Sequence, residues 1–179
     1  MPAFGEAPRG IDDAKVYTVT GAANTVGSSV DLPGIRTVSF NTESDTDELE
    51  GDNKIIAVAR GIKRFTGSIE LGLINLAALA VMQGGTVTNA GTTPAATSSL
   101  DELDDLVSRY FQCIINCPSM DVGGSGYQVT LKKLMVTSGL DESHTVNDWT
   151  TPGLDFSGVS VTGIFATRKQ FETYTPIAP

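Results

Sequence analysis

The sequence predicts a single, mainly β domain with one α-helix. Its 179 residues are close to the usual size of one domain, which can bury one hydrophobic core. The 19 glycines and 8 prolines, together with many Thr, Ser and Val residues, favour strands joined by turns. Apolar and polar residues alternate along several segments, as they do in half-buried strands, and one segment has helix signals at both ends.

The N-terminal part of the chain predicts an arm followed by strands. Residues 1–10 contain two prolines, two glycines and little that can pack, so we expect an N-terminal arm. Residues 14–19 are expected to form the first strand. In residues 35–41, Val38 and Phe40 alternate with polar residues, which predicts a half-buried strand.

The stretch DTDELEGDNKIIAVARGIKR, residues 45–64, changes from acidic to apolar to basic. Mutual repulsion among the acids predicts that residues 43–54 form a long, extended acidic loop. Residues 55–59 are apolar at every position, which predicts a strand covered on both faces. Alternation returns in residues 64–71, so we expect another half-buried strand there.

One helix is predicted with both of its ends. Asn75 can accept hydrogen bonds as an N-cap, residues 76–83 are rich in Ala, Leu and Met, and Gly84-Gly85 can end the helix. The Thr- and Ser-rich residues 86–99 are expected to be a surface loop. Residues 100–111, LDELDDLVSRYF, predict a short second helix capped by Ser99.

The second half of the chain predicts further strands. In YFQCIINCP, Cys113 and Cys117 would lie ~13 Å apart along a strand, too far for a disulfide, so both are expected to be free. GGSG at residues 123–126 predicts a hairpin turn. In residues 127–137 the alternation changes register at Lys132-Lys133, which predicts a β-bulge. A late strand is expected at residues 159–165, and a polar C-terminal arm at residues 168–179.

The charge of -9 argues against a protein that holds nucleic acid through its phosphates, because such proteins carry an excess of Lys and Arg. It does not argue against a protein that lets DNA pass, and it is also typical of many soluble proteins. The N-terminus lacks the apolar core of a signal peptide, and the longest apolar stretch is too short to span a bilayer. Synthesis in the cytoplasm and no membrane partner are therefore expected.

No constellation of residues indicates an enzyme, a metal site or a cofactor. His144 is the only histidine and lies in a polar, turn-rich stretch without a nucleophile motif. The acidic run DTDELEGDN fails the spacing of an EF-hand loop, because Leu49 stands where an oxygen ligand is needed. We therefore expect neither catalysis nor a bound metal or cofactor.

The order of these segments resembles the major tail proteins, or tail tube proteins, of long-tailed bacteriophages with non-contractile tails. The similar segments are EGDNKIIAV after the acidic run, IKRFTGSIEL, LINLAALAVMQGG, GTVTNAGTTP and RYFQCII, within residues 35–166. The resemblance implies a β-sandwich or barrel-like fold with a flanking helix and extended arms. It also implies hexameric rings that stack into the tail tube of the virion, through which DNA is ejected. The helical character of residues 100–111 departs from the family pattern.

The resemblance also implies roles for individual residues. The acidic loop would contact neighbouring subunits through Asp45, Asp47, Glu48, Glu50 and Asp52. Its candidate basic partners are Arg60, Lys63 and Arg64, and the interface strand would contain Ile55, Ile56 and Val58. Candidates for lining the lumen are Thr37, Ser39, Asn41, Thr66, Ser68 and Glu70. The implied partners are copies of the chain and the tail terminator, tape measure and distal tail proteins, while DNA passes without specific binding.

Two other classes of protein stay open. A tube protein of a type VI secretion system would have a similar architecture in another setting. A carbohydrate-binding β-sandwich on a virion surface would need exposed aromatic residues, whereas aromatics make up 7% of the chain and Trp149 is its single tryptophan.

Overall fold

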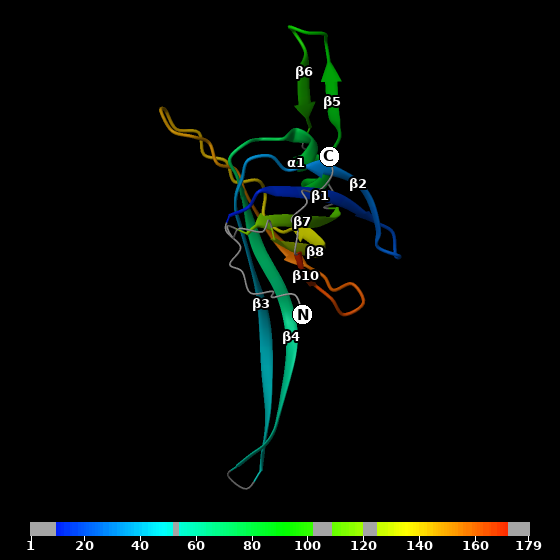
Figure 1. Cartoon of the computed structure of the whole chain (residues 1–179), viewed down its shortest axis with the longest axis vertical. Helices are drawn as coiled ribbons and strands as arrows, with labels where there is room; N and C mark the ends of the chain where they lie inside the picture. The colour runs from blue at the N-terminus through cyan, green and yellow to red at the C-terminus, as the bar shows by residue number, and fades with distance from the viewer. Residues whose placement is uncertain (1–9, 52–53, 102–108, 120–124, 172–179) are drawn as a thin grey trace.

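The computed structural model describes residues 10–51, 54–101, 109–119 and 125–171. The fold is mainly β, which confirms the predicted class, and an antiparallel sheet contains eight of the described strands (Figure 1). The order along this sheet is β2-β1-β7-β8-β9-β4-β3, and β10 also pairs with β8. Its strands are β1 (Asp13–Thr20), β2 (Thr25–Asp31), β3 (Ile35–Gly51), β4 (Lys54–Leu71), β7 (Tyr110–Pro118), β8 (Gly126–Val136), β9 (Gly153–Gly158) and β10 (Ala166–Phe171).

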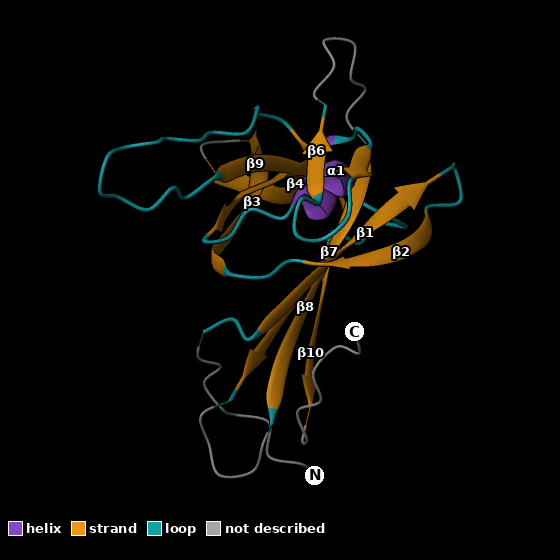
Figure 2. Ribbon diagram, turned by 90° about the horizontal axis from the view of Figure 1, so that it is seen from above, coloured by secondary structure: helices purple, strands orange, loops and turns teal. Residues whose placement is uncertain are grey.

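The helix α1 (Leu76–Gln83) has the predicted bounds and caps. The Asn75 side-chain oxygen accepts hydrogen bonds from the backbone N–H groups of Ala77 and Ala78, at 3.0 and 3.4 Å. Gly84 ends the helix at a φ of 100°. The Asn75 amide also donates to the Asp31 carbonyl at 3.0 Å, so the same side chain fixes the helix to the end of β2. Figure 2 shows α1 within the curve of the main sheet.

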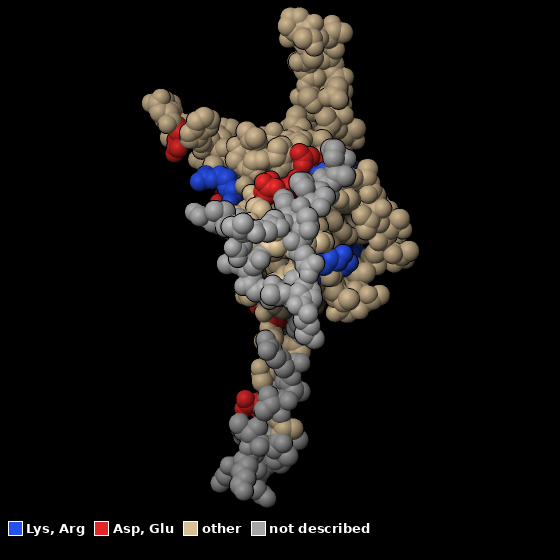
Figure 3. Space-filling view, viewed as in Figure 1, with Lys and Arg blue, Asp and Glu red and all other residues tan. Residues whose placement is uncertain are grey.

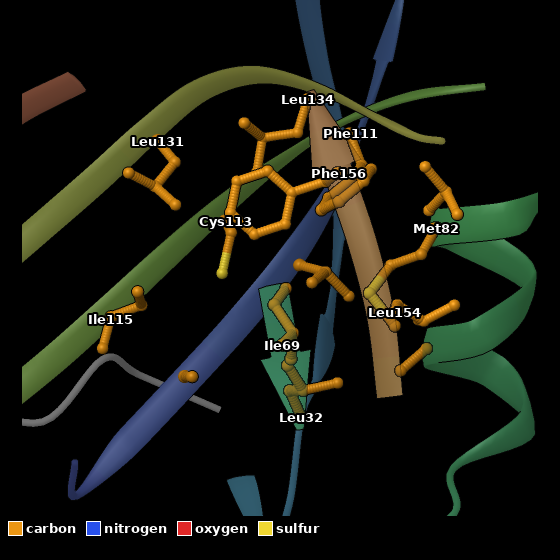
Figure 4. Close-up of a cluster of buried hydrophobic side chains, with 14 of the residues drawn as sticks. Leu32, Ile69, Met82, Phe111, Cys113, Ile115, Leu131, Leu134, Leu154 and Phe156 are labelled. Atoms are coloured by element: carbon orange, nitrogen blue, oxygen red, sulfur yellow. The ribbon is translucent and has the colours of Figure 1, made fainter. Parts of the chain in front are cut away.

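The hydrophobic core lies between α1 and the inner face of the sheet. Met82 extends from the helix toward Leu154 and Phe156 of β9, as Figure 4 shows. Phe65 of β4 lies at the centre of an aromatic group, and its ring centroid is 5.7 Å from that of Phe40 and 6.4 Å from that of Phe156. These contacts fix β3, β4 and β9 against one another, which is the part of the sheet that carries the candidate site.

The predicted β-bulge at Lys132-Lys133 is confirmed. Between the pairs Phe111–Leu134 and Cys113–Leu131, β8 has one more residue than β7. The backbone groups of the bulge pair with the connection from β9 to β10. The Lys132 N–H donates to the Phe165 carbonyl at 2.9 Å, and the Lys133 carbonyl accepts from the Val159 N–H at 2.8 Å. The bulge therefore separates the part of β8 that pairs with β10 from the part that pairs with β9.

Two hairpins project from the body in opposite directions, as Figure 1 shows. The longer one is formed by β3 and β4, whose register runs from Ile35–Leu71 to Gly51–Lys54. β9 pairs with β4 only over residues 65–70, so the distal part of this hairpin is a two-stranded ribbon. The shorter hairpin contains β5 (Val87–Ala90) and β6 (Thr97–Leu100). It carries no Lys, Arg, Asp or Glu and forms the uncharged projection in Figure 3.

The structure corrects the predicted acidic loop at residues 43–54. β3 continues through Gly51 and β4 begins at Lys54, so nearly all of this segment is strand. The repulsion that predicted a loop is reduced because the facing strand is basic where the acids begin, and Glu43 lies opposite Arg64. Residues 55–59 are strand as predicted, but Ala57 is exposed instead of covered.

Three other predicted elements are also wrong. Residues 86–99 were expected to be a loop but contain β5 and most of β6, since Thr- and Ser-rich chains can pair as exposed strands. Residues 159–165 form a turn with a Val161–Ile164 bridge, because Thr162 and Gly163 have positive φ angles. Residues 168–171 belong to β10 instead of a C-terminal arm.

Several predictions fall partly outside the described residues. The second helix at residues 100–111 loses both ends, because Leu100 is in β6 and Tyr110 begins β7, and residues 102–108 are not described. The arms at residues 1–9 and 172–179 and the turn at residues 120–124 also lie outside the described part of the chain. β7 and β8 pair antiparallel on both sides of that turn, as a hairpin requires.

Candidate functional site

The six residues predicted to line a lumen lie opposite one another in the sheet. Their backbone positions form three cross-strand pairs, Thr37–Glu70, Ser39–Ser68 and Asn41–Thr66. Directly opposite residues of an antiparallel pair share a face of the sheet, so all six belong to one face. The Ser39 and Ser68 hydroxyl oxygens are 2.8 Å apart. This polar face, defined by the six residues, is half-exposed at Thr66 and Ser68 and exposed elsewhere.

The polar face continues onto β9. Thr66 pairs with Ser157, and Ser68 pairs with the exposed Asp155. A shallow hollow there is lined by residues that include Glu70, Asp141 and Asp155. The described residues contain no group of three metal-ligating side chains suited to a metal ion. The extension is therefore a hydroxyl- and carboxylate-rich surface that the sequence did not indicate, because β9 is short and bounded by glycines.

The acidic and basic segments of the long hairpin run alongside each other. Glu43 lies opposite Arg64, and Thr46 lies opposite Arg60. Lys63 lies at the register shift between Glu43 and Ser44. The predicted basic partners thus have acidic neighbours within the same chain, whereas we had expected them to meet acids of another subunit. Farther out, Asp47 and Glu48 lie opposite Ala59 and Val58.

The predicted interface strand lies on this two-stranded ribbon. Val58 is opposite Glu48, and Ile55 is opposite Glu50. Ile56 lies at a second register shift, next to the exposed Ala57. Asp45 pairs with Gly61, while Asp52 lies outside the described residues. An apolar run on an isolated pair of strands is only marginally stable in water, because such a ribbon has no second layer to bury it.

The sheet has two outer strands among those described, β2 and β3. Six of the seven residues of β2 are exposed. Each outer strand presents a row of backbone N–H and C=O groups on its free side, which another strand could pair with. β3 is the longer of the two, at 17 residues.

The only histidine lies in the long connection between β8 and β9. His144 Nε2 is 3.3 Å from a Glu142 carboxylate oxygen, and His144 Nδ1 is 3.0 Å from the Thr150 hydroxyl. The His144 side chain is 69% exposed. Water therefore competes for these contacts, and their clear effect is to hold Thr150 near Glu142 within the loop.

The two cysteines are free, as predicted. Burial raises the pKa of Cys113 to about 12 and also raises the pKa of the half-buried Cys117. Both thiols are therefore held in the protonated, weakly nucleophilic form. Their role in this structure is packing at the inner face of β7.

A pair of carboxyl groups lies at the edge between β1 and β2. The pKa of Asp13 is raised, first by burial and then by the charge of Asp31, although Lys15 opposes the shift. The Asp13 and Asp31 side chains also share a hydrogen bond, which favours the protonated form. The fully buried region nearby includes Asn116, which accepts a hydrogen bond from Gln128 at 3.0 Å.

Comparison with known proteins adds no relative from which a role could be transferred. The helix in the described part of the chain has 8 residues and is too short to span a membrane. No protein-family model matches the sequence, and no match is found among curated proteins.

Proposed function

We propose that this chain is the structural subunit of a phage tail tube. Copies of it assemble into rings, the rings stack, and DNA passes through the channel that they enclose. The ring size of six is the number that the resemblance to tail tube proteins implies. The subunit would act in the virion tail, together with the tail terminator, tape measure and distal tail proteins.

The observation that carries this proposal is the apolar run on the projecting hairpin. Residues 55–58 lie beyond the point at which β9 stops pairing with β4. In the single chain this run has only β3 as a neighbour in the sheet. Apolar surface of this kind favours contact with another protein. A neighbouring subunit would cover it and would give the hairpin the second layer that it lacks.

The charges of the hairpin would then set register instead of providing most of the binding energy. Exposed ion pairs contribute ~0 to 1 kcal/mol each, so apolar contact must hold the ring together. The bases are partly matched by acids of their own hairpin, whereas the outer acids lie opposite apolar residues. Asp47 and Glu48 are therefore the better candidates for orienting the hairpin on a neighbour.

The polar face is the candidate lining of the channel. DNA carries a negative charge every ~1.7 Å along its axis, so a basic lining would retain it. The six residues of the polar face contain one carboxylate and no base, and Asp155 adds a second carboxylate. Each subunit also brings nine net negative charges to the ring. Such a surface favours passage of DNA without adhesion.

The test is assembly of the purified protein as a function of concentration, followed by sedimentation velocity. Val58→Asp places a charge in the apolar run, and Thr46→Asp places the same charge elsewhere in the hairpin as a matched control. We expect wild type and Thr46→Asp to form large assemblies, and Val58→Asp to remain monomeric with an unchanged far-ultraviolet circular dichroism spectrum. Assembly of Val58→Asp at the wild-type concentration would remove the support that the hairpin gives.

One observation favours a carbohydrate-binding β-sandwich instead. Trp149 is 89% exposed, and a sugar ring can stack on an exposed aromatic face. Titration of the protein with a panel of oligosaccharides, followed by tryptophan fluorescence, would distinguish this function. A saturable response from a protein that stays monomeric would favour sugar binding over the tube.

A further inference from the structure

The connection between β8 and β9 displays two apolar side chains at its surface. Trp149 is 89% exposed and Val146 is 87% exposed, and these are the highest values among the exposed large apolar residues described. We refer to residues 138–152 as the tryptophan loop. In Figure 1 it projects from the upper left of the body, in gold. An exposed tryptophan is a large apolar surface that binding to a partner would remove from water.

The tryptophan loop is held in shape by its own hydrogen bonds. Asp141 and Gly153 exchange two backbone hydrogen bonds of 3.0 Å at its base. Farther out, the Thr150 hydroxyl and the His144 imidazole are 3.0 Å apart, and the Asp148 carboxylate accepts from the Trp149 N–H at 2.8 Å. A loop fixed in this way loses less conformational freedom on binding. The display of Trp149 is therefore a feature of a preorganised loop.

A second exposed apolar feature lies elsewhere on the same chain. The turn between β9 and β10, residues 159–165, exposes Val159 to 44% and Ile164 to 46%. Its two ends are fixed to the bulge of β8 through Lys132 and Lys133. This apolar turn thus lies directly beside two basic residues.

The tryptophan loop and the apolar turn are complementary in charge as well as in polarity. The loop contains Asp141, Glu142 and Asp148 but neither Lys nor Arg. Figure 3 shows acidic atoms on this projection. The turn itself has no charged residue, and the bases nearest to it by backbone pairing are Lys132 and Lys133. An acidic rim around Trp149 therefore matches a basic rim beside Ile164.

The two features lie on different sides of the body, since Figure 1 shows the turn in orange at the lower right. One chain cannot bring them together, but two copies can. Contact between different patches of identical chains is heterologous, and it repeats until a ring closes or a filament grows. This is the symmetry that a ring or a tube needs.

We propose that Trp149 of one subunit packs against the Val159–Ile164 turn of the next copy of this chain. This contact rests on the proposed self-assembly and specifies one of its interfaces. The acids of the tryptophan loop would face the Lys132–Lys133 bulge of that copy. The partner is a second copy of the chain, because the complementary turn is present on the chain itself.

The single tryptophan makes the contact directly measurable. Trp149 fluorescence is recorded over a concentration series of the full chain, alongside sedimentation velocity on the same samples. Quenching is measured with acrylamide, which is neutral and is not repelled by an acidic protein. On assembly we expect a shift of the emission to shorter wavelength and a several-fold loss of quenching.

Two variants of matched exposure test the receiving turn. Ile164 and Ile74 are both 46% exposed, so Ile164→Asp and Ile74→Asp add the same charge at equally accessible isoleucines. We expect Ile164→Asp to abolish the emission shift and to raise the concentration needed for assembly by more than about tenfold. Ile74→Asp should assemble with the wild-type emission shift.

The possible results separate this contact from the wider proposal. If the protein assembles while Trp149 stays as quenchable as in the monomer, the contact is overturned and the tube function stands. Equal behaviour of Ile164→Asp and Ile74→Asp would also overturn it. If no assembly occurs at any concentration, the proposed function fails. An emission change with oligosaccharide alone, in a monomeric protein, would assign Trp149 to sugar binding and overturn the contact.

Discussion

The hydroxyl oxygens of Ser39 and Ser68 lie 2.8 Å apart at the middle of the polar face. They occupy directly opposite positions of β3 and β4, with Thr37–Glu70 on one side and Asn41–Thr66 on the other. Behind them, Phe40 and Phe65 pack into the core. The same two strands therefore supply the aromatic centre of the subunit and the surface that we assign to the channel.

A gain of DNA binding is expected when this surface is made basic. Thr37→Lys with Asn41→Lys adds two exposed charges per subunit, and repetition around a ring multiplies them. Assembled variant should retain short duplex DNA at low salt, and the retention should fall steeply as salt rises. Co-sedimentation of DNA with the assemblies measures the effect.

The control for this experiment is Thr97→Lys, which adds charge to the exposed surface of β6. Assemblies of wild type and of this control should leave DNA in the supernatant. Retention of DNA by wild-type assemblies at the level of the double variant would contradict the assignment of the polar face.

Gly67 allows the core and the polar face to lie back to back. A Cβ at this position would be 2.5 Å from Cζ of Phe156 and 2.2 Å from the Ser39 carbonyl oxygen. We therefore expect Gly67→Ala to lower the free energy of unfolding by about 1 to 3 kcal/mol, the usual effect of overpacking. Chemical denaturation of the monomer measures it.

Gly61, in the same strand, has no atom within 4 Å of an added Cβ and provides the matched control. Gly61→Ala should leave the free energy of unfolding nearly unchanged. An equal loss of stability in the two variants would show that steric crowding at Phe156 is not the cause.

The stability of the monomer should depend on the ionisation of Asp13. Its pKa is raised above the ordinary value of 3.8 in the folded chain, so protonation favours the folded state. This contribution is fully present below the unfolded pKa and is lost as pH rises through the folded pKa. Asp13→Asn should remove it, so the difference in free energy of unfolding between variant and wild type should change with pH in that window. A difference that stays constant with pH would contradict the assignment.

Cys113 should resist alkylation in the folded protein. Its thiol is buried and its pKa is about 12, so little thiolate is present at pH values where alkylating reagents are used. Iodoacetamide at mildly alkaline pH should modify Cys113 only after unfolding, as mass spectrometry of the peptides would show. The half-buried Cys117 is the internal comparison and should react sooner. Equal labelling of both thiols in folded protein would be the opposing result.

Local signals were sufficient where one short segment determines its own structure. Asn75 and Gly84 gave both ends of α1, because capping involves only backbone groups within a turn of each residue. The parity change at Lys132-Lys133 gave the bulge, because the burial of Leu131 and Leu134 depends directly on which face each residue occupies. Alternation likewise placed the six residues of the polar face together before their register was known.

The remainder depends on partners distant in the sequence. The ribbon of residues 43–64 has exposed positions at Glu43, Thr46, Ala57 and Arg64, so it lacks the alternation that marks a strand with one buried face. β2 is also exposed along most of its length and gave no signal. The exposure of Trp149 follows from the bracing of its loop, which no local pattern reports.

The most direct test of the central claim is negative-stain electron microscopy of the concentrated, purified protein. Self-assembly through the long hairpin predicts rings or tubes with a stain-filled centre, which would be absent from Val58→Asp. Single particles of monomer size at every concentration, with or without a tail initiator complex, would contradict it.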